Sequence, residues 1–328
     1  MASGARPDEA VSAVRTAVRR LVTVAKKAGY LSSGQLAVAV SGGADSLALA
    51  AAAQHQARRL NVTVHGLIVD HGLQPGSDKV AAKAAEQLSA LGIPHVRVLT
   101  TKVEGPGGME AAARRARYEA LRRALPAEDA IVLLGHTKDD QAETVLLGLG
   151  RGSGPRSIAG MRPLDPPWGR PLLTVTRAQT ERACTAQGLT YWSDPHNVDP
   201  AFTRVRLRNE VLPLLEDVLQ GGVADALART AAQLREDNDA LDALAAEMLV
   251  DDPEGLDTQR LVNTPPAIRR RVLRSWLLRS GVTELTDAQL RDIDALIGEW
   301  RGQGGVLLRG GLVAQRAHGR LQLDRASS

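Results

Sequence analysis

Cysteine is almost absent from this chain, which has a single one, Cys184, among its 328 residues. One thiol cannot form a disulfide within the chain, and it cannot supply the several thiolates that hold an iron–sulfur cluster or a structural zinc ion. The sequence therefore excludes a disulfide-stabilised fold and any cysteine-based metal centre built within one chain.

Long apolar segments are also missing. No stretch approaches the ~18 consecutive apolar residues from which a membrane-spanning helix is recognised. The first residues, MASGARPDEAVSAVRTAVRRLV, are charged and have the periodicity of a helix rather than the apolar centre of a secretory signal. We therefore expect a soluble cytoplasmic protein without a membrane partner.

Lysine is scarce and confined to the first part of the chain. All six lysines lie at or before Lys138, and the other 35 cationic residues are arginines. Residues 1–217 contain 27 Lys and Arg against 21 Asp and Glu, whereas residues 218–328 contain 14 against 16. Arginine suits phosphate recognition, but a GC-rich coding bias explains the same preference. The charge therefore permits a nucleic-acid partner without requiring one.

Short apolar segments alternate with helical ones in the first two thirds of the chain. Strands are predicted at 36–40, 61–72, 95–101 and 130–136, and helices from Leu47 onward and over 78–91, 109–125 and 139–150. This alternation predicts right-handed crossovers and a doubly wound parallel α/β sheet. Ligands bind such a sheet beyond the carboxyl ends of its strands.

The pattern changes beyond about Leu219. Amphipathic helices are predicted over 221–250, 265–281 and 286–300, and short apolar runs broken by glycine pairs then predict a small hairpin unit. We therefore expect two domains, a larger α/β domain over residues 1–217 and a smaller, mostly helical one over 218–328.

The turn SGGADS, residues 41–46, joins the first predicted strand to the first helix. It lacks the lysine of the P-loop, so it is not the phosphate loop of the common NTPases. Its glycines nevertheless allow close approach of an anion, its serines offer hydroxyls, and Asp45 is suited to hold Mg²⁺ against phosphates. The alternative is structural: Asp45 or Ser46 caps the helix and the glycines relieve a tight turn.

A second polar segment, HTKDDQAET, follows the fourth predicted strand, and DHG (70–72) follows the second. The acidic residues have a structural explanation, because Asp140 with Glu143 three residues later is an aspartate version of the capping box. However, His136, Asp139 and Asp140 come from the same sheet edge as the glycine turn. Adjacent carboxylates there suit a phosphate-bound metal or a cationic nucleophile, and one can cap while the other takes part in chemistry.

Arginines cluster in two places. Five lie on the helix predicted over 109–125, where a solvated charged face explains most of them. Three more alternate like one face of an extended segment, a row that fits phosphates along an RNA strand. These three are Arg204, Arg206 and Arg208, within an irregular stretch at 191–213. The Gly- and Pro-rich segment 150–171 is too long for a compact connector and is expected to be a functional or mobile loop.

Together and in this order, the motifs resemble one enzyme family. SGGADS is similar to the pyrophosphate loop of the N-type ATP pyrophosphatases, which cleave ATP to AMP and pyrophosphate while adenylating a substrate. Within that group, the resemblance is to the tRNA(Ile)-lysidine synthetase family, over about residues 34–216. It rests on VDHGLQPGS, EAAARRARYEAL, LGHTKDDQAETVLLGLGRGSG, IAGM, RPLL and WSDPHNVDPAFTRVRLRNEVLPLL. RRRVLRSWLL resembles the family's first C-terminal domain, and no counterpart of the second is expected.

The resemblance implies an adenine nucleotide alpha hydrolase-like fold and a reaction in two steps. ATP adenylates the C2 carbonyl oxygen of the wobble cytidine in tRNA(Ile) with a CAU anticodon. Free L-lysine then attacks that carbon and expels AMP, giving lysidine and switching codon reading from AUG to AUA. Mg²⁺ and backbone amides offset the charge on the departing pyrophosphate.

The resemblance also implies roles for individual residues. Nucleotide binding is expected of Ser41, Gly42, Gly43, Ala44, Asp45, Ser46, Asp70, His71, Gly135 and His136. Asp45 and Asp139 are the expected Mg²⁺ ligands, and Asp139 or Asp140 with Glu143 would hold the metal or the lysine. Arg114 or Arg117 would steady the activated intermediate. The residues expected to bind tRNA or phosphates are Arg151, Arg204, Arg206 and Arg208, the last also counted as catalytic.

Two positions depart from the family pattern. The family usually has a small residue where this chain has Lys138, and an Arg-Asn pair where it has Arg204 and Val205.

Three other functions stay open. A tRNA thiolase on the same nucleotide domain carries sulfur on cysteines or an iron–sulfur cluster, which a single cysteine does not provide. A small-molecule amidating ligase, such as an NAD or GMP synthetase, fits the basic excess of residues 1–217 less well. A non-catalytic nucleotide sensor has no use for the acidic pair beside the glycine turn. A homodimer is one possible assembly.

Overall fold

The structure is a computed structural model that describes residues 8–72, 76–104, 108–152, 154–194, 198–249 and 255–325. The chain divides into two compact units, one of residues 1–151 and 160–231 and the other of 152–159 and 232–328. The change from one to the other lies inside a long helix, α10 (Val223–Met248). The domain boundary expected after residue 217 stays a prediction.

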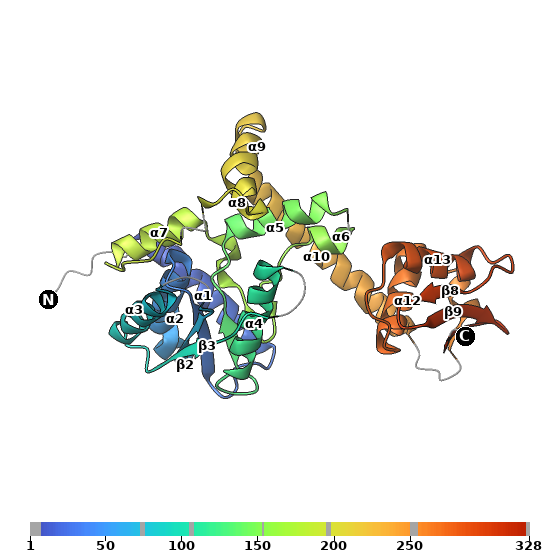
Figure 1. Ribbon diagram of the computed structural model, residues 1–328, viewed down its shortest axis with the longest axis horizontal. Coiled ribbons are helices and arrows are strands. Elements are labelled where there is room, and N and C mark those ends of the chain that lie inside the picture. Colours follow the sequence, from blue (N-terminus) through green and yellow to red (C-terminus); the bar gives the residue numbers. More distant parts are fainter. Residues whose placement is uncertain are drawn as a thin grey trace. The chain divides into compact units, whose positions relative to one another are not determined.

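A six-stranded sheet forms the centre of the first unit, and Figure 1 labels two of its strands, β2 and β3. The strand order is β3-β2-β1-β4-β6-β5. Its strands are β1 (Gln35–Val40), β2 (Thr63–Asp70), β3 (His95–Thr100), β4 (Ile131–Leu133), β5 (Leu164–Asp165) and β6 (Trp168–Gly169). β1 pairs in parallel with both β2 and β4, and β5 is antiparallel to β6. The predicted doubly wound parallel sheet is confirmed.

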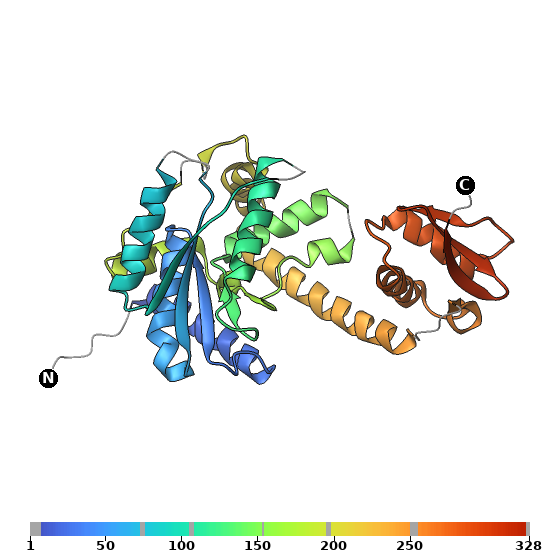
Figure 2. The same cartoon turned by 60° about the horizontal axis from the view of Figure 1, so that its bottom comes forward.

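Helices cover both faces of this sheet (Figure 2). The first face packs against α1 (Glu9–Lys27), α2 (Ala44–Leu60), α3 (Ser77–Ala90) and α7 (Arg177–Ala186), and the other against α4 (Met109–Arg123). Side chains alternate along β1: Leu36 and Val38 belong to the first core and Ala37 to the second. Because both faces are buried, the strand is apolar from Leu36 to Val40.

The strand order places a switch point beside β1. The chain runs from β1 through α2 to β2 on one side, whereas β4 pairs with the other side of β1. Successive connections therefore diverge between β1 and β4, and a crevice opens at the carboxyl ends of these two strands. The glycine turn follows β1, and Gly135 and His136 follow β4.

Further elements of the first unit follow β4. They include α5 (Lys138–Gly150), the 3₁₀ helix η1 (Pro171–Thr174), α8 (Thr203–Arg206), the π-helical η3 (Leu207–Val211) and α9 (Leu212–Val218). The extended row of arginines predicted at 204–208 is therefore wrong, because this stretch is helical. Three parts of the motif segments, residues 73–75, 153 and 195–197, lie outside the described residues.

Segment 150–171 contains short regular elements between its turns, and the expectation of a functional or mobile loop stays a prediction. It contains the short helix α6 (Pro155–Ile158) and the strands β5 and β6, of which β6 pairs with β4. Gln141 of α5 holds its middle, accepting from the Met161 N–H at 2.8 Å and donating to the Met161 carbonyl at 3.1 Å. Gly160 has a φ of +63°, and a Cβ there would lie 2.8 Å from Gln141 Oε1, so the position favours glycine.

The second unit has its own four-stranded antiparallel sheet, in the order β7-β10-β9-β8. Its strands are β7 (Leu256–Asp257), β8 (Val306–Leu308), β9 (Leu312–Ala317) and β10 (Arg320–Arg325), and its helices include α11 (Thr258–Val262), α12 (Pro266–Arg279) and α13 (Asp287–Gly298). The predicted helices and terminal hairpin are confirmed, and β7 joins that hairpin. Within the described residues, no helix has both the length and the apolar character to cross a membrane.

Candidate active site

A cavity of about 680 Å³ lies in the first unit at the carboxyl ends of β1, β2 and β4. Its lining includes the turn after β1, Asp70 and His71 after β2, and Gly135, His136 and Asp140 after β4. The three segments that the sequence pattern assigned to one sheet edge thus surround one cavity. The cavity lies where ligands bind in doubly wound sheets.

The glycine turn is a tightly folded cradle. Ser46 Oγ accepts from the Ser41 backbone N–H at 3.2 Å and donates to the Gly43 carbonyl at 2.9 Å. Gly42 has a φ of +84°, which favours glycine. A Cβ on Gly135 would come within 3.2 Å of the backbone of Asp45, so the end of β4 packs directly on this turn.

The first turn of α2 is open to an anion. Gly43 is the N-cap residue, and among the described residues no side chain caps it. The N–H groups at this positive helix end are therefore left for a ligand, as in other anion sites at helix N-termini. The helix cap considered for Asp45 is wrong, because Asp45 lies inside the first turn; Ser46 stabilises the turn instead.

Asp45 points its carboxylate toward α7. Its Oδ1 accepts a hydrogen bond from Thr180 Oγ1, and its Oδ2 lies 3.6 Å from Nε of Arg177. Burial raises the pKa of Asp45 to about 6, although Thr180 and Arg177 act to lower it. The surroundings of Asp45 therefore disfavour its charged form. Perturbed pKa values of this kind cluster at functional sites.

The capping box of α5 lies three residues earlier than predicted. Thr137 is the N-cap residue, and Asp140 at the third helical position accepts from the Thr137 N–H at 2.7 Å. The box predicted between Asp140 and Glu143 is wrong, because the helix already begins at Lys138, whose N–H donates to the Val175 carbonyl at 2.9 Å. Glu143 is thereby left for other contacts.

Arg177, which sequence reasoning missed, joins the acidic groups. Its Nη2 lies 2.9 Å from Asp140 Oδ1, and its backbone N–H donates to Asp139 Oδ2 at 2.8 Å. Burial disfavours the charge on both Arg177 and Asp140, but their pairing outweighs it, so the pKa of Arg177 is raised and that of Asp140 lowered. The one sequence signal, a T-R-A-Q capping box, predicts a helix start at Thr176 without showing where Arg177 points.

Glu143 is completely buried and held by two arginines. Arg208 Nε donates to Oε1 at 2.8 Å, and Arg204 Nη1 lies 3.5 Å from Oε2. Burial raises the pKa of Glu143, and Asp140 raises it further. Arg208 Nη2 also lies 3.6 Å from Asp140 Oδ1, so Arg208 links the two carboxylates.

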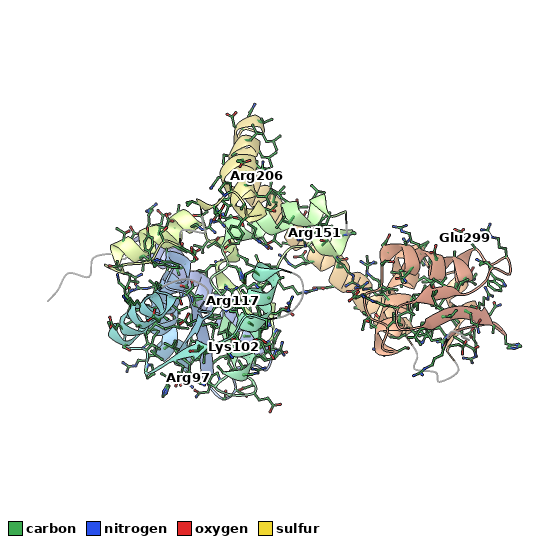
Figure 3. All side chains as sticks on the ribbon, viewed as in Figure 1. Arg97, Lys102, Arg117, Arg151, Arg206 and Glu299 are labelled. Carbon is green, nitrogen blue, oxygen red and sulfur yellow. The ribbon has the colours of Figure 1, made fainter. Side chains whose placement is uncertain are left out.

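Helical spacing explains which arginines of the 204–208 segment reach the site. Arg204 and Arg208 are four residues apart and therefore share a face. Arg206 lies off that face and pairs with Glu210 at 2.8 Å, with both side chains exposed. Figure 3 shows Arg206 on α8 and Arg151 after α5, away from Arg117 on α4.

Three buried polar atoms on the cavity's lining residues lack hydrogen-bond partners in the part of the chain that the structure describes. They are His71 Nδ1, Arg117 Nε and His136 Nδ1. Burial lowers the pKa of His136 to about 3 and that of His71 below its ordinary value, so both rings are neutral at pH 7. Buried polar groups are normally satisfied, so these atoms indicate a polar ligand.

Several predicted site residues lie behind the cavity or elsewhere. The lining formed by described residues does not include Gly42, Arg114, Asp139, Glu143, Arg151, Arg204 or Arg206. The Arg114 guanidinium lies 5.0 Å from the centre of the Tyr118 ring, whereas Arg117 on the same helix reaches the lining. Asp139 binds the N-terminus of α7, and Glu143 supports Arg208.

The two departures from the family pattern have structural explanations. Lys138 donates to Asp225 Oδ1 at 2.6 Å, in the first turn of α10. Val205, which stands between Arg204 and Arg206 in the sequence, has a buried side chain. Neither side chain is part of the cavity lining described above.

Cys184 lies beside the glycine turn. Its Sγ donates to the Ala44 carbonyl at 3.3 Å. Burial raises the pKa of the thiol to about 12. At neutral pH it is protonated and buried, which is typical of a structural cysteine rather than a nucleophile.

The carboxylates on the cavity suit a magnesium ion that is bound together with phosphates. Within the described residues no group of three or more His, Cys, Asp or Glu is arranged to hold a metal by itself. Asp45 and Asp140 both line the cavity. Mg²⁺ commonly takes one or two carboxylates and completes its shell with phosphate oxygens and water, so this donor set fits.

The sheet, the glycine turn and the cavity define a nucleotide-binding protein of the PP-loop class. Residues 14–215 match the family described as PP-loop domain, and residues 256–322 match the TilS substrate binding domain. The chain is 60% identical over 300 residues to a tRNA(Ile)-lysidine synthase of Nocardia farcinica, covering 88% of this chain and 92% of the relative. It is 57% identical over 323 residues to that of Rhodococcus erythropolis, covering 96% and 95%.

The chain therefore belongs to the tRNA(Ile)-lysidine synthase family, ATP-dependent ligases that form a carbon–nitrogen bond. This confirms the predicted family and enzyme class. A solved structure, the U34-tRNA thiolase NcsA from Methanococcus maripaludis with its 4Fe–4S cluster, is 16% identical with a TM-score of 0.56, covering 69% of this chain and 80% of that one. At this identity the likeness shows the shared fold alone.

Proposed function

We propose that this protein converts the wobble cytidine of tRNA(Ile) with a CAU anticodon to lysidine. ATP adenylates the C2 oxygen of the base with release of pyrophosphate, and free L-lysine then displaces AMP. The proposal is carried by the 60% and 57% identity, over nearly the whole length of both chains, to relatives named for this reaction. The cytoplasm, where tRNA and ATP are present, is its proposed place of action.

The glycine turn is the proposed pyrophosphate site. The uncapped N–H groups at the start of α2 and the hydroxyl of Ser41 can donate to phosphate oxygens. Ser46 is committed to holding the turn, so its role is to fix the shape of the cradle. His71 and His136 line the cavity, and their Nδ1 atoms, which no described residue partners, suit the rest of the nucleotide.

Asp45 and Asp140 are the proposed holders of Mg²⁺, with the phosphates supplying further ligands. When bound, Mg²⁺ would offset the negative charge that develops on pyrophosphate as it leaves. Asp139 was the second ligand expected from sequence, but its Oδ2 accepts the Arg177 N–H. Support for Asp140 is that it lines the cavity.

Arg117 is the proposed partner of the adenylated intermediate. It lies on the cavity with a buried Nε that has no partner in the described structure, whereas Arg114 is not among the described residues that line the cavity.

Arg206 is the proposed phosphate contact for tRNA in the 204–208 segment. Its pairing with Glu210 is exposed, and such pairs are easily exchanged. Arg204 and Arg208 are instead engaged with Glu143. Arg151 is a further proposed contact, at the end of α5. A homodimer stays part of the proposal and is open to test by light scattering.

Mass spectrometry of the tRNA tests the proposal directly. Incubation of tRNA(Ile) with ATP, Mg²⁺, L-lysine and enzyme should add about 128 Da, the mass of lysine minus water, to one cytidine. AMP and pyrophosphate should appear at full rate only when tRNA and lysine are both present. A sulfur-containing base would support a thiolase, ADP and phosphate would exclude this chemistry, and ATP binding without turnover would support a sensor.

Cys184→Ser is expected to keep near-normal activity. Amine attack on an adenylated base needs no thiol, and a serine hydroxyl can still donate to the Ala44 carbonyl. The measurement is the tRNA-dependent release of AMP, after a thermal melt has shown that the variant is folded. Loss of turnover with retained ATP binding in the folded variant would favour sulfur chemistry.

A further inference from the structure

Two of the carboxylates that line the cavity, those of Asp45 and Asp140, each have one oxygen committed to a structural hydrogen bond. Asp45 Oδ1 accepts from Thr180 Oγ1. Asp140 Oδ2 accepts from the Thr137 N–H at 2.7 Å and from the Thr137 hydroxyl at 2.9 Å. Each carboxylate therefore has its other oxygen left for a cation.

A single guanidinium, that of Arg177, makes ionic contacts with both of these remaining oxygens. Arg177 Nη2 lies 2.9 Å from Asp140 Oδ1, and its Nε lies 3.6 Å from Asp45 Oδ2. Arg208 also approaches Asp140 Oδ1, at 3.6 Å, but its closer partner is Glu143 at 2.8 Å. Arg177 thus bridges one carboxylate from the turn after β1 and one from the helix after β4.

The position of Arg177 is fixed by its own backbone. Asp139 Oδ2 accepts its N–H at 2.8 Å, and Thr180, one turn along α7, shares its single hydroxyl proton between the Asp45 carboxylate and the Arg177 carbonyl. The side chain is 23% exposed and lines the cavity. The first turn of α7 therefore delivers a cation to the place where a nucleotide's phosphates would meet the carboxylates.

We propose that Arg177 is a place-holding cation that keeps divalent metal out of the Asp45–Asp140 pair until a nucleotide enters. This rests on the proposed use of Mg²⁺ with ATP. The triphosphate offers the guanidinium new oxygen partners, and a fork of N–H donors suits phosphate well. Once the guanidinium moves to phosphate, the two free carboxylate oxygens face the metal. Metal and nucleotide then enter together, and Arg177 acts as a positioning residue.

Nδ1 of His136 lies on the same cavity and has no hydrogen-bond partner among the described residues, which independently points to a ligand there. The glycine turn contains no lysine or arginine, so a cation for the phosphates must come from elsewhere in the fold. Arg177 supplies it.

Mn²⁺ binding without nucleotide, tRNA or lysine tests the proposal, with free Mn²⁺ followed by electron paramagnetic resonance. Wild-type protein should bind Mn²⁺ weakly, and the Arg177→Gln variant should bind it about tenfold or more tightly. One neighbouring charge shifts the equilibria of ionic groups in proteins by about this factor. Adding a non-cleavable ATP analogue should tighten Mn²⁺ binding strongly in the wild type and less in the variant. Arg182→Gln, on the same helix with a 63% exposed side chain, should match the wild type.

A second variant keeps the test decisive if Arg177→Gln unfolds. Arg177→Lys retains the charge but cannot bridge two carboxylates as a fork, so its Mn²⁺ affinity should lie between the other two. Adding Asp140→Asn to either variant should remove the gain. Equal Mn²⁺ affinity in wild type and folded variants would overturn the proposal. Because no tRNA or lysine is present, failure of the lysidine assay leaves this result unchanged.

Discussion

Asp45→Asn is expected to lower the rate of ATP cleavage by roughly 10²- to 10³-fold or more while the protein stays folded. The carboxylate lies at the start of α2 on the proposed phosphate site, where it would hold Mg²⁺. Asparagine keeps an oxygen that accepts from Thr180, so the local geometry survives. Release of AMP and pyrophosphate measures the rate, and a thermal melt measures folding.

The pH dependence of stability should identify the same carboxylate. Burial raises the pKa of Asp45 from 3.8 to about 6, so its ionisation in the folded protein opposes folding by about 3 kcal/mol at about 1.4 kcal/mol per pKa unit. This penalty is absent below about pH 4 and complete above about pH 6. The melting temperature of Asp45→Asn minus that of the wild type should therefore be more positive at pH 8 than at pH 4.5.

Asp78→Asn is the matched control, because Asp78 is exposed and lies in the first turn of α3. It should change neither the rate nor the pH dependence. An active, folded Asp45→Asn enzyme would instead assign Asp45 a purely structural role.

The position of the cavity could be predicted because it depends on topology. Parallel strands of a doubly wound sheet end at one edge, so the turn after β1 and the residues after β4 had to lie together. The sequence alone could not show which of two possible capping boxes begins α5. Thr137 with Asp140 and Asp140 with Glu143 both fit the spacing, and the contact of Lys138 with Val175 decides where α5 begins.

Contacts between distant segments could not be predicted from local pattern. Arg177 follows Asp45 by more than a hundred residues, and only the packing of α7 against α2 brings them together. The sequence spacing of the three arginines at 204–208 is compatible with an extended segment and with a helix. In the helix, the pairing partners of Arg206 and Arg208 differ completely, and so does the expected effect of replacing each.

Arg208→Gln is expected to destabilise the protein by about 3 kcal/mol and to abolish turnover. The change leaves Glu143, whose side chain is 0% exposed, with Arg204 at 3.5 Å as its remaining cation, and breaking a buried pair is costly. Thermal melts measure the loss of stability. Arg206→Gln on the same segment is the control: its exposed pair should leave the melt unchanged. It should lower the salt dependence of tRNA binding by about one unit if Arg206 meets a phosphate.

The double variant Glu143→Gln with Arg208→Gln separates stability from function. Removing both charges leaves no unpaired buried carboxylate, so most of the lost stability should return. Turnover should stay low, because Arg208 also contacts Asp140 on the cavity, at 3.6 Å. If Arg208→Gln instead melts like the wild type, turns over normally, and lowers the salt dependence of tRNA binding by about one unit, Arg208 is a phosphate contact as the sequence pattern suggested. The pairing with Glu143 would then contribute little to the folded state.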